Sequence, residues 1–276
     1  DGTKVERLNV MPFDNELEMK ETDWRDDLKA QVKSFQPDLI GMSATEDMWE
    51  LGIGILEEIE DYILRTKTPV LTGGVFSTFA PEIAIKHRLV NMVCVGEGEN
   101  AIRTLCERIE KGQSFNDVTN LWVKAEDGTI TKNSMSDPVD VNAMPMMDIT
   151  LFDEQRMMRP MAGKWYKMLP METMRGCPYK CTYCNSPDQM DLYSAATPEV
   201  SFFRKKNVDL VYKELKYFKD EIGLEYNYFW ADTFLALSDR EFDEFCEMYS
   251  DIKLPFWMQT RPETLTDYKV KKLKEV

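Results

Sequence analysis

Three cysteines of this sequence stand within eight residues of one another, at Cys177, Cys181 and Cys184. Thiolates at this C-x3-C-x2-C spacing can reach three corners of one small metal cluster, whereas ordinary ferredoxin-type clusters use four cysteines. No fourth cysteine lies nearby in the sequence. A [4Fe–4S] cluster held by three cysteines leaves one iron open, and a reacting ligand needs such an open position. The spacing therefore predicts an iron–sulfur centre with a free coordination position.

A structural zinc site is the alternative interpretation of the same cysteines. Zinc sites usually pair their ligands in two separated clusters, but the single histidine, His87, lies far upstream of the cysteine loop. Cys94, Cys106 and Cys246 fall in apolar patterns, where cysteine behaves as a small hydrophobe. The sequence therefore favours the iron–sulfur interpretation, while a zinc-knotted binding protein stays open as the competing hypothesis.

The elements around the cysteine loop alternate between strand and helix patterns. A strand is expected at 168–174, directly before the cysteines, and two more at 226–230 and 256–259. Helices with apolar faces are expected at 208–218 and 239–249. Strands separated by single helices pair in parallel, and the loops after such strands are where these folds bind ligands. Three such units begin a barrel without closing it.

The first part of the chain shows the same alternation up to about residue 110. Strands are expected at 5–10, 39–43, 69–71 and 89–95, and helices at 49–64 and 100–111. A hairpin is expected at 118–133, with its turn at Asp127-Gly128. We therefore predict an α/β fold class, with a Rossmann-like domain over 1–135, a linker over 136–160 and an incomplete barrel over 161–276.

The stretch from Met174 to Cys184 resembles the signature loop of the radical S-adenosylmethionine (SAM) superfamily. The resemblance implies that the three cysteines bind a [4Fe–4S] cluster whose open iron chelates SAM. It further implies that the reduced cluster cleaves SAM to a 5′-deoxyadenosyl radical, and that the barrel is a partial (β/α)6 radical SAM barrel. An electron donor such as flavodoxin or ferredoxin is an implied partner.

The same resemblance marks candidate SAM-binding residues. Tyr183, the aromatic residue before the last cysteine, is expected to approach the adenine. The strand-end candidates are Asp232, Thr233, Gln259 and Arg261. Two of these have other interpretations from the residues alone: Asp232 equally fits a strand-end turn or helix cap, and Arg261 a surface salt bridge.

Small and hydroxyl-bearing residues follow the strands expected in the first part of the chain. Glycines at the carboxyl edge of a sheet let backbone approach a ligand, and hydroxyls add hydrogen bonds. Placed before the cysteine loop, the set resembles the cobalamin-binding domain of cobalamin-dependent radical SAM enzymes. The resemblance implies cobalamin bound by Ser43, Thr45, Gly73, Gly74, Thr78, Glu97 and Gly98. The pattern Asp-x-His-x-x-Gly, whose histidine ligates cobalt in many such domains, is absent. No histidine of this chain is therefore expected on cobalt, and a relic domain that binds nothing stays open.

The composition bounds the class of protein. The 276 residues carry 49 acidic and 34 basic side chains, a net charge of −15, which argues against nucleic acid or an anionic membrane as partner. No apolar run approaches the roughly 20 residues needed to span a bilayer. No secretion signal is visible, and three crowded cysteines are typical of a metal site in a reducing compartment, so a cytoplasmic location is expected. The chain begins with Asp1 rather than Met, and we expect it to be part of a longer protein.

Together these expectations describe an enzyme acting on a small-molecule substrate. The resemblance implies hydrogen abstraction from an unactivated carbon, followed by cobalamin-dependent methyl transfer. One alternative is an oxidative cyclase or ring-rearranging enzyme of the anaerobic Mg-protoporphyrin monomethyl ester cyclase type. A second alternative is a non-catalytic module that binds cobalamin or an iron–sulfur cluster. The sequence does not specify the substrate.

Overall fold

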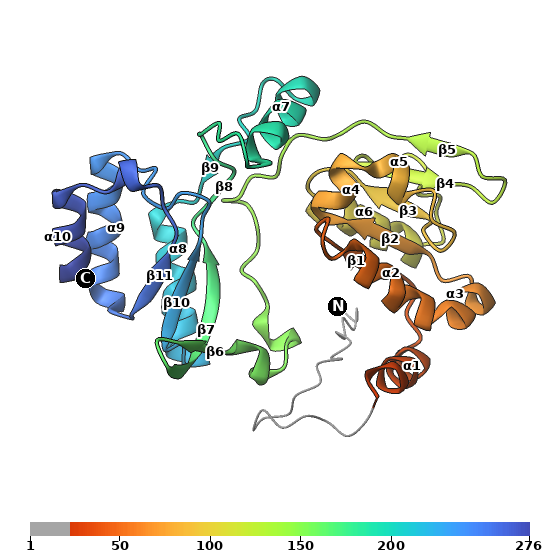
Figure 1. The fold of residues 1–276 in the computed structure, drawn as a ribbon, viewed down its shortest axis with the longest axis horizontal. Coiled ribbons are helices and arrows are strands. Elements are labelled where there is room, and N and C mark those ends of the chain that lie inside the picture. The colour runs from red at the N-terminus through yellow and green to blue at the C-terminus, as the bar shows by residue number, and fades with distance from the viewer. Residues whose placement is uncertain (1–22) are drawn as a thin grey trace. The chain divides into compact units, whose positions relative to one another are not determined.

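The computed structural model describes residues 23–276, so the strand expected at 5–10 lies outside the described residues. The chain divides into two compact units, the first ending at Val139 and the second beginning at Asp140. In Figure 1 the first unit runs from red to yellow-green and the second from green to blue. The division falls inside the stretch predicted as a linker.

The first unit contains one five-stranded sheet. Its strands follow chain order, β1 (Ile40–Ser43), β2 (Val70–Gly73), β3 (Met92–Cys94), β4 (Leu121–Lys124) and β5 (Ile130–Lys132). The first three strands are parallel, and the β4–β5 hairpin continues the sheet antiparallel to β3. Strands β2 and β3 are buried along almost their whole length, as expected for parallel strands covered on both faces. The hairpin is thus predicted correctly, and it belongs to the same sheet.

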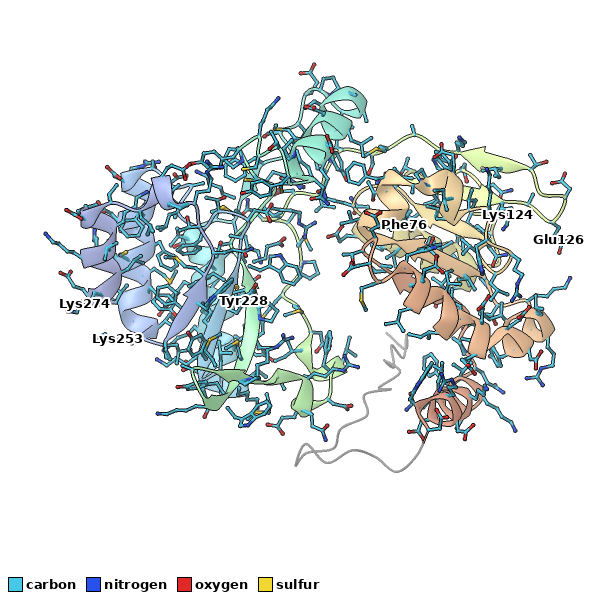
Figure 2. The ribbon with its side chains drawn as sticks, in the orientation of Figure 1. Phe76, Lys124, Glu126, Tyr228, Lys253 and Lys274 are labelled. Carbon is cyan, nitrogen blue, oxygen red and sulfur yellow. The ribbon has the colours of Figure 1, made fainter. Side chains whose placement is uncertain are left out.

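Six helices accompany this sheet in the described part of the first unit. They are α1 (Trp24–Phe35), α2 (Trp49–Glu58), α3 (Glu60–Thr66), α4 (Gly74–Phe79), α5 (Pro81–Ala84) and α6 (Glu99–Glu110). The helix expected at 49–64 is interrupted at Ile59, where the backbone leaves the helical region (φ −112°, ψ 16°). The ring of Phe76 on α4, labelled in Figure 2, stacks on Trp49 of α2 at 4.3 Å between centroids. This contact joins the two helices over the carboxyl ends of β1 and β2.

The second unit is built on a four-stranded sheet with a separate two-stranded ribbon. The sheet order is β11 (Phe256–Met258), β10 (Tyr226–Trp230), β7 (Lys164–Glu172) and β6 (Met158–Met161), and the ribbon pairs β8 (Met174–Arg175) with β9 (Arg204–Lys205). Strands β7, β10 and β11 are parallel, as predicted for three βα units, while β6 is antiparallel to β7. The α/β fold class expected from the sequence is therefore confirmed for both units.

Four longer helices belong to the second unit. They are α7 (Ser186–Ala196), α8 (Val208–Tyr217), α9 (Asp239–Ile252) and α10 (Asp267–Glu275). Helix α9 begins with a capping box, in which Ser238 and Glu241 satisfy each other's backbone N–H groups. Its expected apolar face is buried against the sheet, and Figure 1 shows α9 and α10 to one side of the strands.

The two faces of β10 differ sharply. Phe229 is completely buried, and its ring meets the rings of Phe234 and Phe245 on the helix side of the sheet. Tyr228, labelled in Figure 2, points to the opposite face and stacks on Trp257 of β11 at 4.6 Å and 5°. From residue 23 onward, no helix is long and apolar enough to cross a membrane.

Candidate functional site

The cysteine loop is entered through a glycine that no other residue could replace without strain. Strand β7 ends at Glu172, two residues earlier than expected, and the short strand β8 leads to Gly176. Gly176 has φ +80°, and a Cβ there would lie 2.8 Å from the carbonyl oxygen of Phe202 and about as close to its ring. Positive φ and this close approach both require glycine. The turn therefore directs the chain into the loop while Phe202 packs against it.

The three cysteines differ in exposure along the loop. Cys177 is buried at 8%, Cys181 is half-buried and Cys184 is exposed, and none of them is in a disulfide. The backbone N–H of Ser186 at the start of α7 donates to Sγ of Cys184 at 3.5 Å. Over residues 23–276, no three or more His, Cys, Asp or Glu side chains converge on the position of a single metal ion. Thiolates on a four-iron cluster attach to different irons, so they need not meet at one point.

Two of the predicted strand-end residues contact the cysteines directly. The hydroxyl of Thr233, after β10, lies 3.6 Å from Sγ of Cys177. The guanidinium of Arg261, after β11, donates from Nη1 to Sγ of Cys181 at 2.7 Å. The fold thus brings the ends of two neighbouring parallel strands onto two of the three thiols.

Arg261 is held in place by further contacts. Its Nη2 donates to Glu263 at 2.5 Å, and its guanidinium carbon lies 4.5 Å from the ring centroid of Tyr179. The hydrogen bond to Glu263 raises the pKa of Arg261 above its ordinary value. The Nε atom is buried and has no hydrogen-bond partner among the described residues. The salt bridge considered for Arg261 exists, and it accompanies the thiol contact rather than replacing it.

The remaining SAM candidates lie on the same loops. Asp232 is exposed, yet desolvation by the surrounding protein raises the pKa of its carboxyl. The carbonyl of Gln259 accepts a hydrogen bond from the N–H of Phe234 at 3.0 Å, which ties the end of β11 to the loop after β10. Tyr183 is 91% exposed, so its ring lies open on the cysteine loop.

Sequence reasoning missed two residues that contact the site. Tyr179 lies inside the cysteine motif and supports Arg261 with its ring face. Ser186 opens α7 and supplies the N–H that Cys184 accepts. Two features of the sequence point to these residues. Tyr179 lies between the first two cysteines of the motif, and Pro187 at the first turn of α7 marks a helix start directly after the loop.

The residues expected to bind cobalamin gather at the carboxyl edge of β1, β2 and β3. Gly74 has φ +86°, and a Cβ there would lie 2.8 Å from both the Ala44 carbonyl and the Ser43 hydroxyl. The N–H of Ala44 donates to the carbonyl of Gly73 at 3.2 Å. The ends of β1 and β2 are therefore joined with no room for a side chain at Gly74.

Several polar side chains in this group form hydrogen bonds within the first unit at this edge of the sheet. The Thr78 hydroxyl donates to the Gly74 carbonyl at 2.9 Å and accepts from the Gly96 N–H at 3.1 Å. Glu97 accepts from the Val139 N–H at 2.8 Å, and Thr45 donates to Asp47. Gly98 is followed directly by helix α6. The fold brings the predicted set together, but it already uses three of these side chains for internal hydrogen bonds.

Comparison with known proteins identifies the second unit's domain. Residues 171–276 match the family model described as the Radical SAM superfamily. The chain is 24% identical over 255 residues to an uncharacterised methyltransferase of Pyrococcus horikoshii, covering 90% of this chain and 51% of that protein. It is 27% identical over 153 residues to 4′-phospho-dehydrooxetanocin synthase of Priestia megaterium, covering 54% of this chain and 20% of that protein. The chain thus spans about half the length of the first relative and a fifth of the second.

Two solved structures share the fold of most of the chain. The cobalamin-dependent SAM radical enzyme OxsB aligns over 91% of this chain and 35% of its own, with a TM-score of 0.67 and 20% identity. The radical SAM methyltransferase TsrM of Kitasatospora setae, solved with cobalamin and a [4Fe–4S] cluster, aligns over 92% of this chain and 50% of its own, with a TM-score of 0.60 and 16% identity. The resemblance to cobalamin-dependent radical SAM enzymes predicted from the sequence is confirmed: residues 171–276 match the Radical SAM superfamily model, and the chain is similar in fold to these enzymes.

Proposed function

We propose that this chain is the part of a radical SAM enzyme that binds a [4Fe–4S] cluster through Cys177, Cys181 and Cys184. When bound, the cluster supplies the electron that cleaves SAM and releases the 5′-deoxyadenosyl radical, which abstracts hydrogen from a small-molecule substrate. One observation carries this proposal: Thr233 and Arg261, from adjacent strand ends, contact the thiols of Cys177 and Cys181. Proteins adjust the reduction potential of such clusters through hydrogen bonds and charge at the sulfurs.

The donor set fits an iron–sulfur group. Three thiols on one loop supply the soft ligands that iron–sulfur clusters require. The Ser186 N–H and the Arg261 guanidinium donate hydrogen bonds to the sulfurs of Cys184 and Cys181. The buried Nε of Arg261 lacks an acceptor, so the site has an unfilled place for a further electron-rich atom.

The strand-end residues would position SAM. We propose that Asp232 receives the amino group of its methionine moiety, because a carboxylate with a raised pKa gains most from a cationic partner. Gln259 and Thr233 flank the same loops, and the exposed ring of Tyr183 is free to approach the adenine. A flavodoxin or ferredoxin would supply the electron that reduces the cluster.

The first unit is proposed to be a Rossmann-like domain that binds cobalamin at the carboxyl edge of β1, β2 and β3. The position of Ser43, Gly73 and Gly74 at the carboxyl ends of β1 and β2 supports this assignment, because open α/β sheets bind ligands at that edge. OxsB has been solved with aqua-cobalamin bound, which supports the same assignment by fold. His87 lies in the turn after α5, where its Nδ1 accepts from the Leu89 N–H, so cobalt would take no histidine from this edge.

We propose methyl transfer to an unactivated carbon as the reaction. The methyltransferase of Pyrococcus horikoshii is similar along 90% of this chain, which supports methyl transfer over the oxidative cyclase alternative. Turnover with methyl-labelled SAM tests the proposal in the full-length enzyme. Label in the product is expected, and product without label would overturn methyl transfer.

Anaerobic reconstitution with iron and sulfide tests the cluster. The reduced protein should give a [4Fe–4S]+ electron paramagnetic resonance (EPR) signal that changes when SAM is added. Cys184→Ala should lose most of its iron, while Cys106→Ala, which removes an exposed cysteine outside the motif, should keep it. A colourless wild-type protein, or a signal indifferent to SAM, contradicts the proposed function.

A further inference from the structure

We infer that Arg261 is a positioning residue for Cys181 that makes the cluster easier to reduce, rather than a clamp for the carboxylate of SAM. This inference rests on the proposed function, because it concerns the cluster held by the three cysteines. It assigns Arg261 a role that the sequence alone does not indicate.

The guanidinium of Arg261 points at the sulfur of Cys181. Nη1 of Arg261 lies 2.7 Å from Sγ of Cys181, although eighty positions separate the two residues in the chain. Tyr179 lies against one face of the guanidinium at 4.5 Å, and Glu263 accepts from Nη2. Two contacts therefore fix the direction in which the third, to the cysteine sulfur, is made.

The existing contacts of Arg261 limit which of its N–H groups remain for SAM. A strong grip on a carboxylate uses two parallel N–H groups of arginine. Nη1 and Nη2 of Arg261 each already donate one N–H, to Cys181 and Glu263, and the Nε N–H is buried. The N–H groups left for SAM are one on each Nη atom and the buried Nε, so a bidentate hold on SAM would have to share the guanidinium with both existing contacts.

The charge of Arg261 acts on the reduction potential of the cluster. Reduction adds one negative charge to the cluster, so a cation at the sulfur of Cys181 stabilises the reduced form more than the oxidised form. The Arg261 side chain is 31% exposed, and screening by salt is weaker for such a partly buried charge than for a fully exposed one. Arg261 therefore raises the reduction potential, while the Glu263 carboxylate beside it lowers the same potential.

The test is a redox titration of reconstituted protein with dithionite and mediators, without SAM, in which EPR intensity reports the reduced cluster. Arg261→Gln should show a roughly tenfold lower ratio of reduced to oxidised cluster at a given potential, a shift of about 59 mV to more negative values. Arg261→Lys keeps the charge and should shift less. Glu263→Gln removes the neighbouring negative charge and should shift the midpoint to more positive values.

Equal midpoints in wild type and Arg261→Gln, with the SAM-induced spectral change weakened, would assign Arg261 to SAM and overturn the inference alone. A wild-type protein that builds no cluster overturns the inference and the proposed function together. If Arg261→Gln fails to fold, as judged by circular dichroism, the opposite-signed shift of Glu263→Gln still tests the electrostatic argument, and its absence overturns it.

Discussion

The hydroxyl of Thr233 lies 3.6 Å from Sγ of Cys177, and both residues are buried, at 2% and 8% exposure. The contact joins the end of β10 to the cysteine that lies deepest in the loop. It means that the first cysteine is placed by the sheet as well as by its own loop. Disturbing this strand end should therefore affect the cluster without touching a ligand.

Thr233→Val removes the hydroxyl and keeps the shape of the side chain. We expect a loss of about 1 kcal/mol in unfolding free energy and a changed EPR spectrum of the reduced cluster. Thr197→Val is the control, because Thr197 is also buried, at 8% exposure, and its hydroxyl donates to the Tyr193 carbonyl at 3.2 Å. The control should lose similar stability and leave the spectrum unchanged. Identical spectra for both variants would show that Thr233 has no influence on Cys177.

Gly176→Ala tests the turn into the loop. Alanine at positive φ costs about 1–2 kcal/mol, and the new Cβ would also collide with the Phe202 carbonyl 2.8 Å away. Gly163→Ala is the matched control, since Gly163 has φ +76° but nothing within 4 Å of its Cβ position. Urea unfolding and iron content measure the outcome. We expect a larger stability loss and less iron for Gly176→Ala only, and equal effects would argue against the close packing.

The strands and the long helices near the site follow from sequence periodicity. Strand β10 has the predicted bounds, and α9 buries the predicted face, because alternation and a 3.6-residue repeat are set by local burial. Helix α7 was missed, since its sequence has apolar residues scattered around the helix with no single buried stripe. The β6–β7 hairpin was missed because its turn uses Ala162 and Gly163, both at positive φ, rather than the usual Asn-Gly.

The contacts within the site cannot be predicted from the periodicity of the sequence. The motif predicts that the cysteines act together, but Arg261 reaches Cys181 only because β11 lies beside β10 in the sheet. Such a contact depends on side-chain direction at a strand end, which no repeat in the sequence encodes. The same holds for the internal hydrogen bonds that occupy Thr78 and Glu97 at the edge of the first sheet.

Cysteine alkylation should separate the loop thiols from the packing thiols in the cluster-free protein. Burial raises the pKa of Cys94 to about 12 and that of Cys246 to about 11, whereas Cys184 is exposed. Since the thiolate is the nucleophile, iodoacetamide at pH 8 should modify Cys184 first and Cys94 and Cys246 last. Mass spectrometry of timed samples measures the order. Early modification of Cys246 would contradict the packing of α9.

Glu241 should make stability depend on acid pH. Burial opposes its ionisation, but hydrogen bonds from Lys205 and Ser238 outweigh it and lower the pKa from 4.5 to about 2. A depressed pKa contributes stability that is present above pH 4.5 and is lost as the pH falls toward 2. Glu241→Gln keeps an N3 residue suited to a capping box and loses the charge.

The wild type should therefore be more stable than Glu241→Gln at pH 6, and the difference should shrink by pH 3. Urea unfolding at both pH values measures it. Glu126→Gln is the control, because Glu126 is 94% exposed and forms an ion pair with Lys67 at 3.5 Å on the surface. A difference between wild type and Glu241→Gln that stays constant from pH 6 to pH 3 would contradict the assignment.

The pair of Lys206 and Glu214 fastens α8 to the strand that leads into the cysteine loop. The two side chains are 9% and 5% exposed and approach to 2.8 Å, and the N–H of Lys206 donates to the Thr173 carbonyl at 2.9 Å. Removing one partner of a buried pair leaves an uncompensated charge, so Glu214→Gln should cost about 3–5 kcal/mol of unfolding free energy. The strand next to the loop should loosen with it, lowering the iron content.

Two further variants show whether burial is the cause. Asp220→Asn breaks the exposed pair with Lys216, at 42% and 44% exposure, and should cost no more than about 0.5 kcal/mol. The double variant Lys206→Met with Glu214→Leu removes both charges and should recover most of the stability lost in Glu214→Gln, because no charge is left buried alone. Urea unfolding followed by tryptophan fluorescence ranks the variants. If Glu214→Gln and Asp220→Asn cost the same, the pair is solvated in solution and does not fasten α8.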